Sequence, residues 1–203
     1  MKAMFKDALI LFAITVIAGV LLGAVYQITK DPIAAQEQKA KENACREVFM
    51  QADHFKQARG FEEDGPTAVI LNNYPQESID NCQSALSESG DILGYVLTVT
   101  THEGYGGDIQ FMMGVTNDGT LNGISLLSIS ETAGLGMQAE DVLVPQFKDK
   151  NVSSFTYTKN GSVKDSEIDA ISGATITTNA ITNGVNAGLE YISGLLDGSA
   201  GGE

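Results

Sequence analysis

The sequence is poor in positive charge, and the deficit is concentrated in its middle. Of 203 residues, 12 are Lys or Arg and 26 are Asp or Glu, so the formal net charge is −14. No Lys or Arg lies between Arg59 and Lys148, whereas Asp and Glu recur throughout that stretch. This balance argues against nucleic acid or an anionic lipid surface as the partner of this region, because both would repel it. An anionic ligand held there must rely on backbone amide groups.

Metal-ligating side chains are also scarce. The chain has two cysteines, Cys45 and Cys82, and two histidines, His54 and His102, and it lacks a Cys-x-x-Cys motif. A zinc or iron–sulfur site built by this chain alone is therefore not expected. If the region is exported, Cys45 and Cys82 are suited to form a disulfide, and two thiols are the equally weighted alternative.

One uncharged apolar run is long enough to cross a membrane. Residues 8–29, ALILFAITVIAGVLLGAVYQIT, carry no charge, and a spanning helix needs about 20 apolar residues. A cleaved signal peptide is the alternative, but its apolar region is usually about 7 to 15 residues long. Lys2 and Lys6 precede the run, so the positive-inside rule favours a cytoplasmic N-terminus over residues 1–7. The acidic remainder would then be extracytoplasmic, anchored to the cell membrane by a single span.

The residues after this run predict a connecting helix and then a surface region. Helix formers dominate residues 30–59. An apolar face recurs there at helical spacing, at Ala40, Ala44, Val48 and Phe49. A short strand is expected at residues 68–71, and the turn formers around it place the rest of residues 60–91 at the surface.

The next part of the chain predicts an antiparallel sheet. Segments rich in β-branched and apolar residues indicate strands at 92–101, 108–116 and 120–130. Asn-Asp-Gly at residues 117–119 suits a hairpin turn between the last two. A further strand is expected at residues 153–159.

A stretch dense in small and hydroxyl side chains follows. Residues 169–181 read DAISGATITTNAI, and from Ile176 onward apolar residues recur three or four apart, which predicts an amphipathic helix. The expected fold class is therefore α+β, an antiparallel sheet with flanking helices behind a transmembrane helix. The domain is expected over residues 60–197, followed by a disordered tail at 198–203.

The start of this last helix is suited to bind an anion. Amide groups at a helix N-terminus are partly positive and bind phosphate without a lysine. Gly173 and Ala174 would let a ligand approach the backbone closely. The hydroxyls of Thr175 and Thr177 either cap the helix or attach a group that carries a phosphate, and spacing alone favours the cap.

Three motifs together resemble a known family. GYGGDI at residues 104–109, SETAGLG at 130–136 and IDAISGAT at 168–175 follow one another behind a single apolar anchor. The last contains the Asp-x-x-Ser/Thr-Gly-Ala-Thr signature of proteins that carry FMN esterified through its phosphate to the final threonine. The chain resembles the RnfG family, the FMN-binding component of the Rnf ion-translocating ferredoxin:NAD oxidoreductase. The related NqrC component of the sodium-pumping NADH:quinone reductase shares the signature but is typically longer.

The resemblance implies a covalent FMN on Thr175, placed there by a flavin transferase that takes FMN from FAD. It also implies that Ser172, Gly173 and Ala174 hold the phosphate end of the cofactor. The ring and ribityl chain would face Glu131, Thr132 and Leu135, with Tyr105 near the ring. Asp169 would serve recognition by the transferase. Ala133 stands where the family often has proline, so a softer loop is expected there.

The function implied is that of an electron-carrying subunit of a membrane oxidoreductase complex, which is not catalytic alone. Its partners would be the other subunits of that complex and, during maturation, the flavin transferase. Two alternatives stay open from the residues. One is a free-standing anchored flavoprotein, and the other is an anchored binding or scaffold module without a cofactor, in which the hydroxyl-rich helix start is only a cap.

Overall fold

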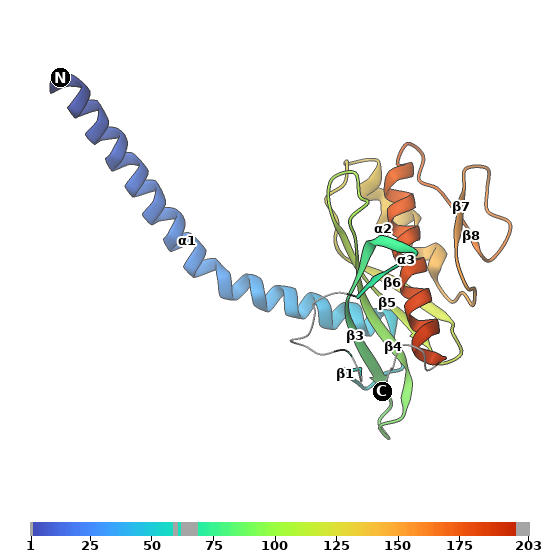
Figure 1. Cartoon of the computed structure of the whole chain (residues 1–203). Helices are drawn as coiled ribbons and strands as arrows, with labels where there is room; N and C mark the ends of the chain where they lie inside the picture. Colours follow the sequence, from blue (N-terminus) through green and yellow to red (C-terminus); the bar gives the residue numbers. More distant parts are fainter. Residues whose placement is uncertain (1, 59–60, 62–68, 198–203) are drawn as a thin grey trace. The chain divides into compact units, whose positions relative to one another are not determined.

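The computed structural model describes residues 2–58, 61 and 69–197, so the tail expected at 198–203 lies outside the described part. The chain divides into two compact units, residues 1–42 and 43–203 (Figure 1). Its elements are α1 (Lys2–Val48), β1 (His54–Gln57), β2 (Val69–Leu71), β3 (Tyr74–Leu86), β4 (Ile92–Thr101), β5 (Ile109–Thr116), β6 (Leu121–Ser128), η1 (Gly136–Gln138), α2 (Ala139–Val142), η2 (Val144–Phe147), β7 (Thr156–Thr158), β8 (Glu167–Asp169) and α3 (Thr175–Leu196).

The first unit consists of helix alone. The most apolar 18-residue window of α1 has a mean hydropathy of 2.8, and none of that window is buried. Among the described residues, α1 is the one helix long and apolar enough to cross a membrane. The expected long apolar helix at the N-terminus is thereby confirmed.

α1 ends earlier than its composition suggests. Helix was expected to residue 59, but it stops at Val48 and β1 follows at His54. The amide of Asp53 donates to the carbonyl of Leu86 at 2.9 Å, and β1 pairs antiparallel with β3. Pairing with the sheet therefore overrides the helix propensity of this segment. Of the expected apolar face, Ala40 is exposed, whereas Ala44, Val48 and Phe49 are buried.

The main sheet is antiparallel throughout. Its strand order is β1-β3-β4-β5-β6, and β2 also pairs with β3. β4, β5 and β6 lie where the sequence predicts strands, and the predicted turn at residues 117–119 joins β5 to β6. In that turn Gly119 has φ +82°, and its amide donates to the carbonyl of Thr116 at 3.0 Å. β7 and β8 form a separate parallel pair.

The expectation that residues 72–91 lie at the surface is wrong. Most of this segment is β3, a 13-residue strand hydrogen-bonded between β1 and β4. The register shifts between Ile79 and Asn81, so Ile79 opposes Val99 and Cys82 opposes Leu97. This bulge at Asp80 puts Ile79 and Cys82, three positions apart, on the same face. The break in the period of two explains why the segment does not look like a strand in the sequence.

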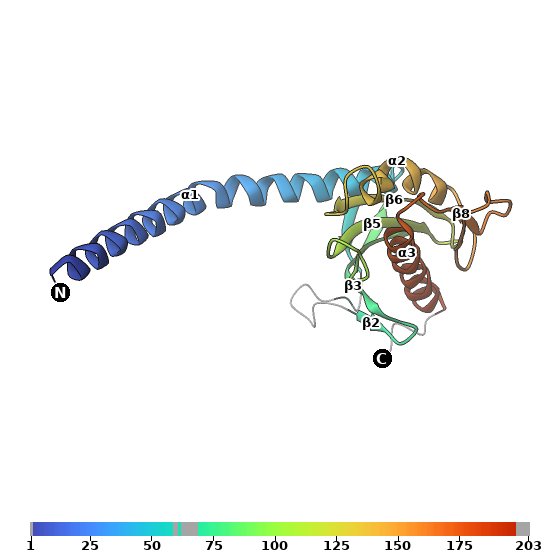
Figure 2. The ribbon, with the colours of Figure 1, turned by 90° about the horizontal axis from the view of Figure 1, so that it is seen from above.

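The sheet has a hydrophobic cluster on each face. Alternation along the strands places Leu97 and Met113 on one face and Val96 and Met112 on the other. α3 packs on the first face, where it runs along the sheet in Figures 1 and 2. The end of α1 and the residues just after it cover the second face, where Phe49 is 1% exposed.

The two cysteines lie on opposite faces of the sheet and are thiols, so the disulfide alternative is not found. Cys45 Sγ is 3.4 Å from Gln83 Oε1 and 3.6 Å from Met112 Sδ, on the α1 side. Cys82 is fully buried on the α3 side, and burial raises the pKa of its thiol to about 12. At neutral pH this thiol is therefore protonated and unreactive.

Phe49→Ala tests whether the segment after α1 seals the second face. We expect the substitution to lower the free energy of unfolding of the full chain in detergent by about 3–5 kcal/mol, because it empties a packed site. Met50→Ala is the matched control, since Met50 is the next residue and is 77% exposed. Denaturant titration compares the two variants. Equal losses of unfolding free energy would contradict the role of Phe49 in sealing the second face.

Candidate functional site

A pocket with a volume of about 510 Å³ opens at the N-terminal end of α3. Three segments line it: the β4–β5 loop, the loop between β6 and η1, and the start of α3. The lining residues are Tyr105, Glu131, Thr132, Leu135, Gly136, Gly173, Ala174, Thr175, Ile176 and Thr177. The structure thus brings together seven of the nine residues that the sequence suggested for a cofactor site.

The first turn of α3 has no side-chain cap. Its N-cap residue is Ala174, whose side chain cannot accept a hydrogen bond. Thr178 stabilises the preceding loop instead: its Oγ1 accepts from the amide of Ile171 at 3.1 Å and donates to the carbonyl of Ala174 at 2.9 Å. The first amide groups of a helix have no acceptor within the helix. The start of α3 therefore presents partly positive groups at a pocket, without the cap that the simpler interpretation required.

The two candidate hydroxyls at this helix start differ in their contacts. Thr177 is 1% exposed, and its Oγ1 donates to Glu131 Oε2 at 2.9 Å. Thr175 is half-buried in the pocket lining, and its hydroxyl makes no hydrogen bond to the described residues. Thr175, and not Thr177, therefore has a hydroxyl available to a ligand.

Glu131 is the carboxylate of the pocket, and it connects all three lining segments. It is 9% exposed. Oε1 accepts from the amide of Gly106 in the β4–β5 loop at 3.1 Å, and Oε2 accepts from Thr177 of α3. Since each oxygen accepts a hydrogen bond from a different segment, Glu131 holds the pocket together.

Glycines allow the loops to approach this carboxylate. A Cβ on Gly136 would lie 2.5 Å from Thr177 Oγ1 and 2.8 Å from Glu131 Oε2. A Cβ on Gly106 would lie 2.0 Å from the carbonyl oxygen of Ser130. All three distances are shorter than any van der Waals contact, so only glycine fits at these positions.

The walls of the pocket are apolar and partly open. Tyr105 is 70% exposed, Ile176 is 51% exposed and Leu135 is 39% exposed. Most large apolar side chains of the domain are buried, whereas these three are exposed around one pocket. Their exposure there marks a surface for an apolar ligand group. The pocket therefore joins an apolar wall to an amide-rich helix start.

Two of the expected residues, Asp169 and Ser172, do not line the pocket. Asp169 ends β8, and its carboxylate accepts from the amide of Ser162 at 2.6 Å and from the Ser162 hydroxyl at 3.2 Å. Its backbone exchanges hydrogen bonds with the side chain of Gln146. Asp169 thus shapes the loop between β7 and β8, while Ser172 is exposed.

Gly136 and Ile176 line the pocket but were not among the expected site residues, and Thr177 was expected only as a candidate hydroxyl at the helix start. Gly136 closes the SETAGLG motif, so its place could have been inferred from the motif. Ile176 belongs to the apolar pattern of α3, and periodicity alone assigns it to the core. Its exposure arises because it lies in the first turn, beside the pocket.

Comparison with known proteins assigns a class to this domain. Residues 104–190 match the FMN-binding domain family, and every residue that lines the pocket lies within that range. The chain is therefore a protein with an FMN-binding domain behind an apolar N-terminal helix. Residues 1–48 match a second family, the RnfG N-terminal region.

Relatives of nearly the same length identify the family. The chain is 30% identical over 196 residues to the G subunit of the Na⁺-translocating ferredoxin:NAD⁺ oxidoreductase complex of Acetobacterium woodii, covering 96% of this chain and 94% of the relative. It is 33% identical over 197 residues to the G subunit of the proton-translocating complex of Clostridium ljungdahlii, with 93% and 95% covered. The chain belongs to the RnfG family, the G subunits of the Rnf ion-translocating ferredoxin:NAD⁺ oxidoreductases.

A solved structure supports the fold. The crystal structure of NqrC from Shewanella oneidensis superposes with a TM-score of 0.53 at 16% identity, over 76% of this chain and 74% of that one. At this identity the likeness concerns the fold alone. It confirms the α+β class expected from the sequence.

Glu131→Ala tests the role of the buried carboxylate. Without it, the amide of Gly106 and the hydroxyl of Thr177 lose their partner, and we expect a loss of about 1–3 kcal/mol in the free energy of unfolding. Glu131→Gln is the control, because its carbonyl can accept from Gly106 and its amide can donate to Thr177. Denaturant titration of the flavin-free full chain should give Glu131→Gln a free energy of unfolding near that of the parent. A Glu131→Gln variant as unstable as Glu131→Ala would contradict this role.

Proposed function

We propose that the chain carries FMN covalently, through a phosphoester bond to Thr175, and transfers electrons within a membrane oxidoreductase complex. One observation carries the covalent part of the proposal. The Thr175 hydroxyl lies in the pocket without a hydrogen bond to the described residues, directly at a helix start that lacks a side-chain cap. The neighbouring Thr177 hydroxyl is occupied by Glu131.

The residues of the pocket fit such a cofactor. A phosphodiester keeps one negative charge, and the amide groups at the start of α3 would offset it. Gly173 has φ +78°, a conformation that favours glycine. A Cβ there would lie 3.0 Å from Leu135 Cδ2, so the absence of a side chain leaves this edge of the pocket accessible to a ligand. No Lys or Arg occurs between Arg59 and Lys148 that could offset the phosphodiester charge instead.

Each part of the pocket has a separate task in this proposal. Thr175 supplies the oxygen that forms the phosphoester, while the diphosphate bond of FAD breaks and AMP leaves. Tyr105, Leu135 and Ile176 shield the flavin ring from water, and Glu131 keeps the three loops in place. When bound, FMN supplies one-electron and two-electron transfer. Covalent attachment would prevent the loss of a cofactor that lies outside the cytoplasm.

Family membership supports the cellular part of the proposal. The two relatives named above are subunits of ion-translocating ferredoxin:NAD⁺ oxidoreductase complexes. We infer that this chain assembles with the other subunits of such a complex and receives its flavin from a flavin transferase. Asp169, away from the pocket, would be recognised by that enzyme through the loop it shapes.

Intact mass of the denatured chain tests the attachment. We expect the full chain, produced together with a flavin transferase, to be heavier than its sequence by FMN less water, and Thr175→Ala to lose this increment entirely. Thr156→Ala is the matched control, because it makes the same change at an exposed threonine of β7. An increment that persists in Thr175→Ala would place the flavin elsewhere, and no increment in the parent would refute covalent attachment.

Fusions at the C-terminus test the orientation of the domain. We propose that residues 1–7 are cytoplasmic and that the domain is extracytoplasmic, since Lys2 and Lys6 precede the apolar run. Alkaline phosphatase, which needs disulfides from an oxidising compartment, should be active as a C-terminal fusion. A fluorescent reporter that folds only in the cytoplasm should be dark. The opposite pattern would reverse the orientation.

A further inference from the structure

The loop between β4 and β5 carries Tyr105 to the pocket, and it is attached to α3 on both sides of that residue. On one side, Glu103 Oε2 accepts from Asn183 Nδ2 at 2.6 Å and, more weakly, from Asn179 Nδ2 at 3.4 Å. Asn179 and Asn183 lie one and two turns beyond Thr175, outside the pocket lining. Glu103 thus ties the first half of the loop directly to the helix that bears the proposed flavin attachment.

On the other side of Tyr105, Gly106 makes the second attachment. Its amide donates to Glu131, which in turn accepts from Thr177 of α3. Tyr105 therefore lies between two anchors that both end on the same helix. Its side chain is 70% exposed and touches too little of the domain to hold its own position. The anchors must set where it lies.

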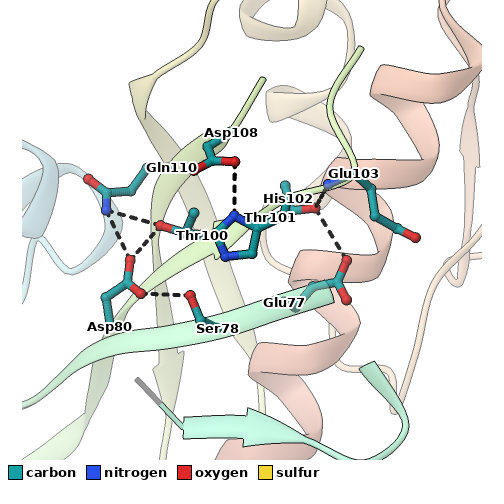
Figure 3. A network of polar contacts seen from close by, with 9 residues as sticks. All are labelled: Glu77, Ser78, Asp80, Thr100, Thr101, His102, Glu103, Asp108 and Gln110. Carbon is teal, nitrogen blue, oxygen red and sulfur yellow. Dashed lines mark hydrogen bonds and ion pairs between the residues drawn. The ribbon is translucent and has the colours of Figure 1, made fainter. Parts of the chain in front are cut away.

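A second carboxyl group lies beside the first anchor. Glu77 of β3 is 3% exposed, and its Oε1 accepts from Thr101 Oγ1 at 3.2 Å. Thr101 Oγ1 also accepts from the amide of Glu103 at 3.3 Å, so Thr101 lies between the two glutamates and links them. Figure 3 shows this group on one side of β4, while Thr100 contacts Asp80 on the other side.

The two glutamates also interact through their charges. Burial and the negative charge of Glu103 raise the pKa of Glu77 to about 7, so Glu77 is protonated below neutral pH. Tyr74 of β3 and Glu190 of α3 also titrate on this side, and burial, followed by the charges of Glu190 and Glu77, raises the pKa of Tyr74. No cation among the described residues is paired with either glutamate.

We propose that Glu103, held by Asn183 and linked to Glu77 through Thr101, is a positioning residue that fixes the β4–β5 loop and with it Tyr105 at the flavin pocket. The inference rests on the proposed function only for the identity of the pocket's ligand. Below neutral pH the proton on Glu77 removes the repulsion between the two glutamates. Above it, the buried carboxylate of Glu77 and the half-buried carboxylate of Glu103 repel each other and the Glu103 anchor loosens.

The sign of the pH effect follows from the linkage of proton binding to folding. The folded chain binds the Glu77 proton more tightly than the unfolded chain, for which the ordinary pKa is 4.5. The stabilisation is complete below about pH 4.5 and is lost as the pH rises through about 7. The loop should therefore be better ordered at pH 6 than at pH 8, values chosen about one unit on either side of that pKa.

Amide hydrogen exchange of the flavin-free full chain in detergent tests the anchor without relying on the cofactor. Asn183→Ala should lower the protection of the Gly106 amide, which donates to Glu131, by at least about 10-fold, since a charged hydrogen bond that anchors the loop is lost. Asn73→Ala is the matched control: Asn73 Nδ2 also bonds a glutamate of α3, Glu190, at 2.9 Å, but away from the pocket. Unchanged protection in Asn183→Ala would overturn the proposal.

A fold control and a pH series complete the test. Amides of β5 should stay protected in each variant. If Asn183→Ala exposes them, the same comparison is made with two milder substitutions, Asn179→Ala and Glu103→Gln.

In the parent, protection corrected for intrinsic exchange should fall between pH 6 and pH 8, about one unit on either side of the expected pKa. In Glu77→Gln it should not, because this side chain carries no charge at any pH and does not repel Glu103. A Glu77→Gln variant with the parent's pH dependence would overturn the role of Glu77.

Visible circular dichroism of the flavin-loaded chain links the anchor to the cofactor. Asn183→Ala should change the flavin bands, because Tyr105 moves, and Asn73→Ala should leave them unchanged. If exchange responds as expected and no flavin is bound, the anchor stands and the proposed function fails. If flavin is bound and its bands do not respond to Asn183→Ala, the positioning role fails while the proposed function stands.

Discussion

The pocket depends on the buried carboxylate of Glu131. Its two oxygens join the β4–β5 loop, through the amide of Gly106, to the start of α3, through the hydroxyl of Thr177. A buried carboxylate is costly unless hydrogen bonds compensate for the lost water, so each partner stabilises the others. Gly136 and Gly106 are glycines because these segments meet at distances that leave no room for a Cβ. One side chain therefore determines the shape of a site built from three distant parts of the sequence.

The electrostatics of the site follow from a shortage of cations. Between Arg59 and Lys148 the chain has no Lys or Arg, so the positive end of α3 is the charge available to an anion near the pocket. The uncapped first turn and the Thr175 hydroxyl lie together there. In a typical helix, a serine or threonine at the N-cap would have used these amide groups. Here Ala174 leaves them to a ligand, and Thr178 holds the preceding loop instead.

The sequence predicts most of the fold where its patterns are regular. β4, β5, β6 and α3 have clear periodicity and lie where expected. β3 was missed because the bulge at Asp80 breaks its alternation and because its strand carries buried polar residues such as Glu77 and Ser84. The end of α1 was placed too late because pairing of β1 with β3 overrides local propensity, which a single sequence does not reveal.

The candidate site was predictable to the extent that short motifs carry it. The motifs at residues 130–136 and 168–175 supplied all but one of the expected lining residues. The anchors of the β4–β5 loop were not predictable, because Asn179 and Asn183 contact Glu103 across some eighty positions of sequence. Asp169 illustrates the reverse case. It belongs to a motif, but its carboxylate shapes a neighbouring loop and does not line the pocket.

Phosphorus NMR of the purified, flavin-loaded chain tests the central claim most directly. A phosphodiester has no proton to gain near neutral pH, whereas the phosphate of unattached FMN is a monoester with a second pKa of about 6. We expect one resonance whose chemical shift stays constant between about pH 5 and pH 8 and which remains with the chain after denaturation. A resonance that titrates with a pKa of about 6, or that leaves the denatured chain, would contradict covalent attachment.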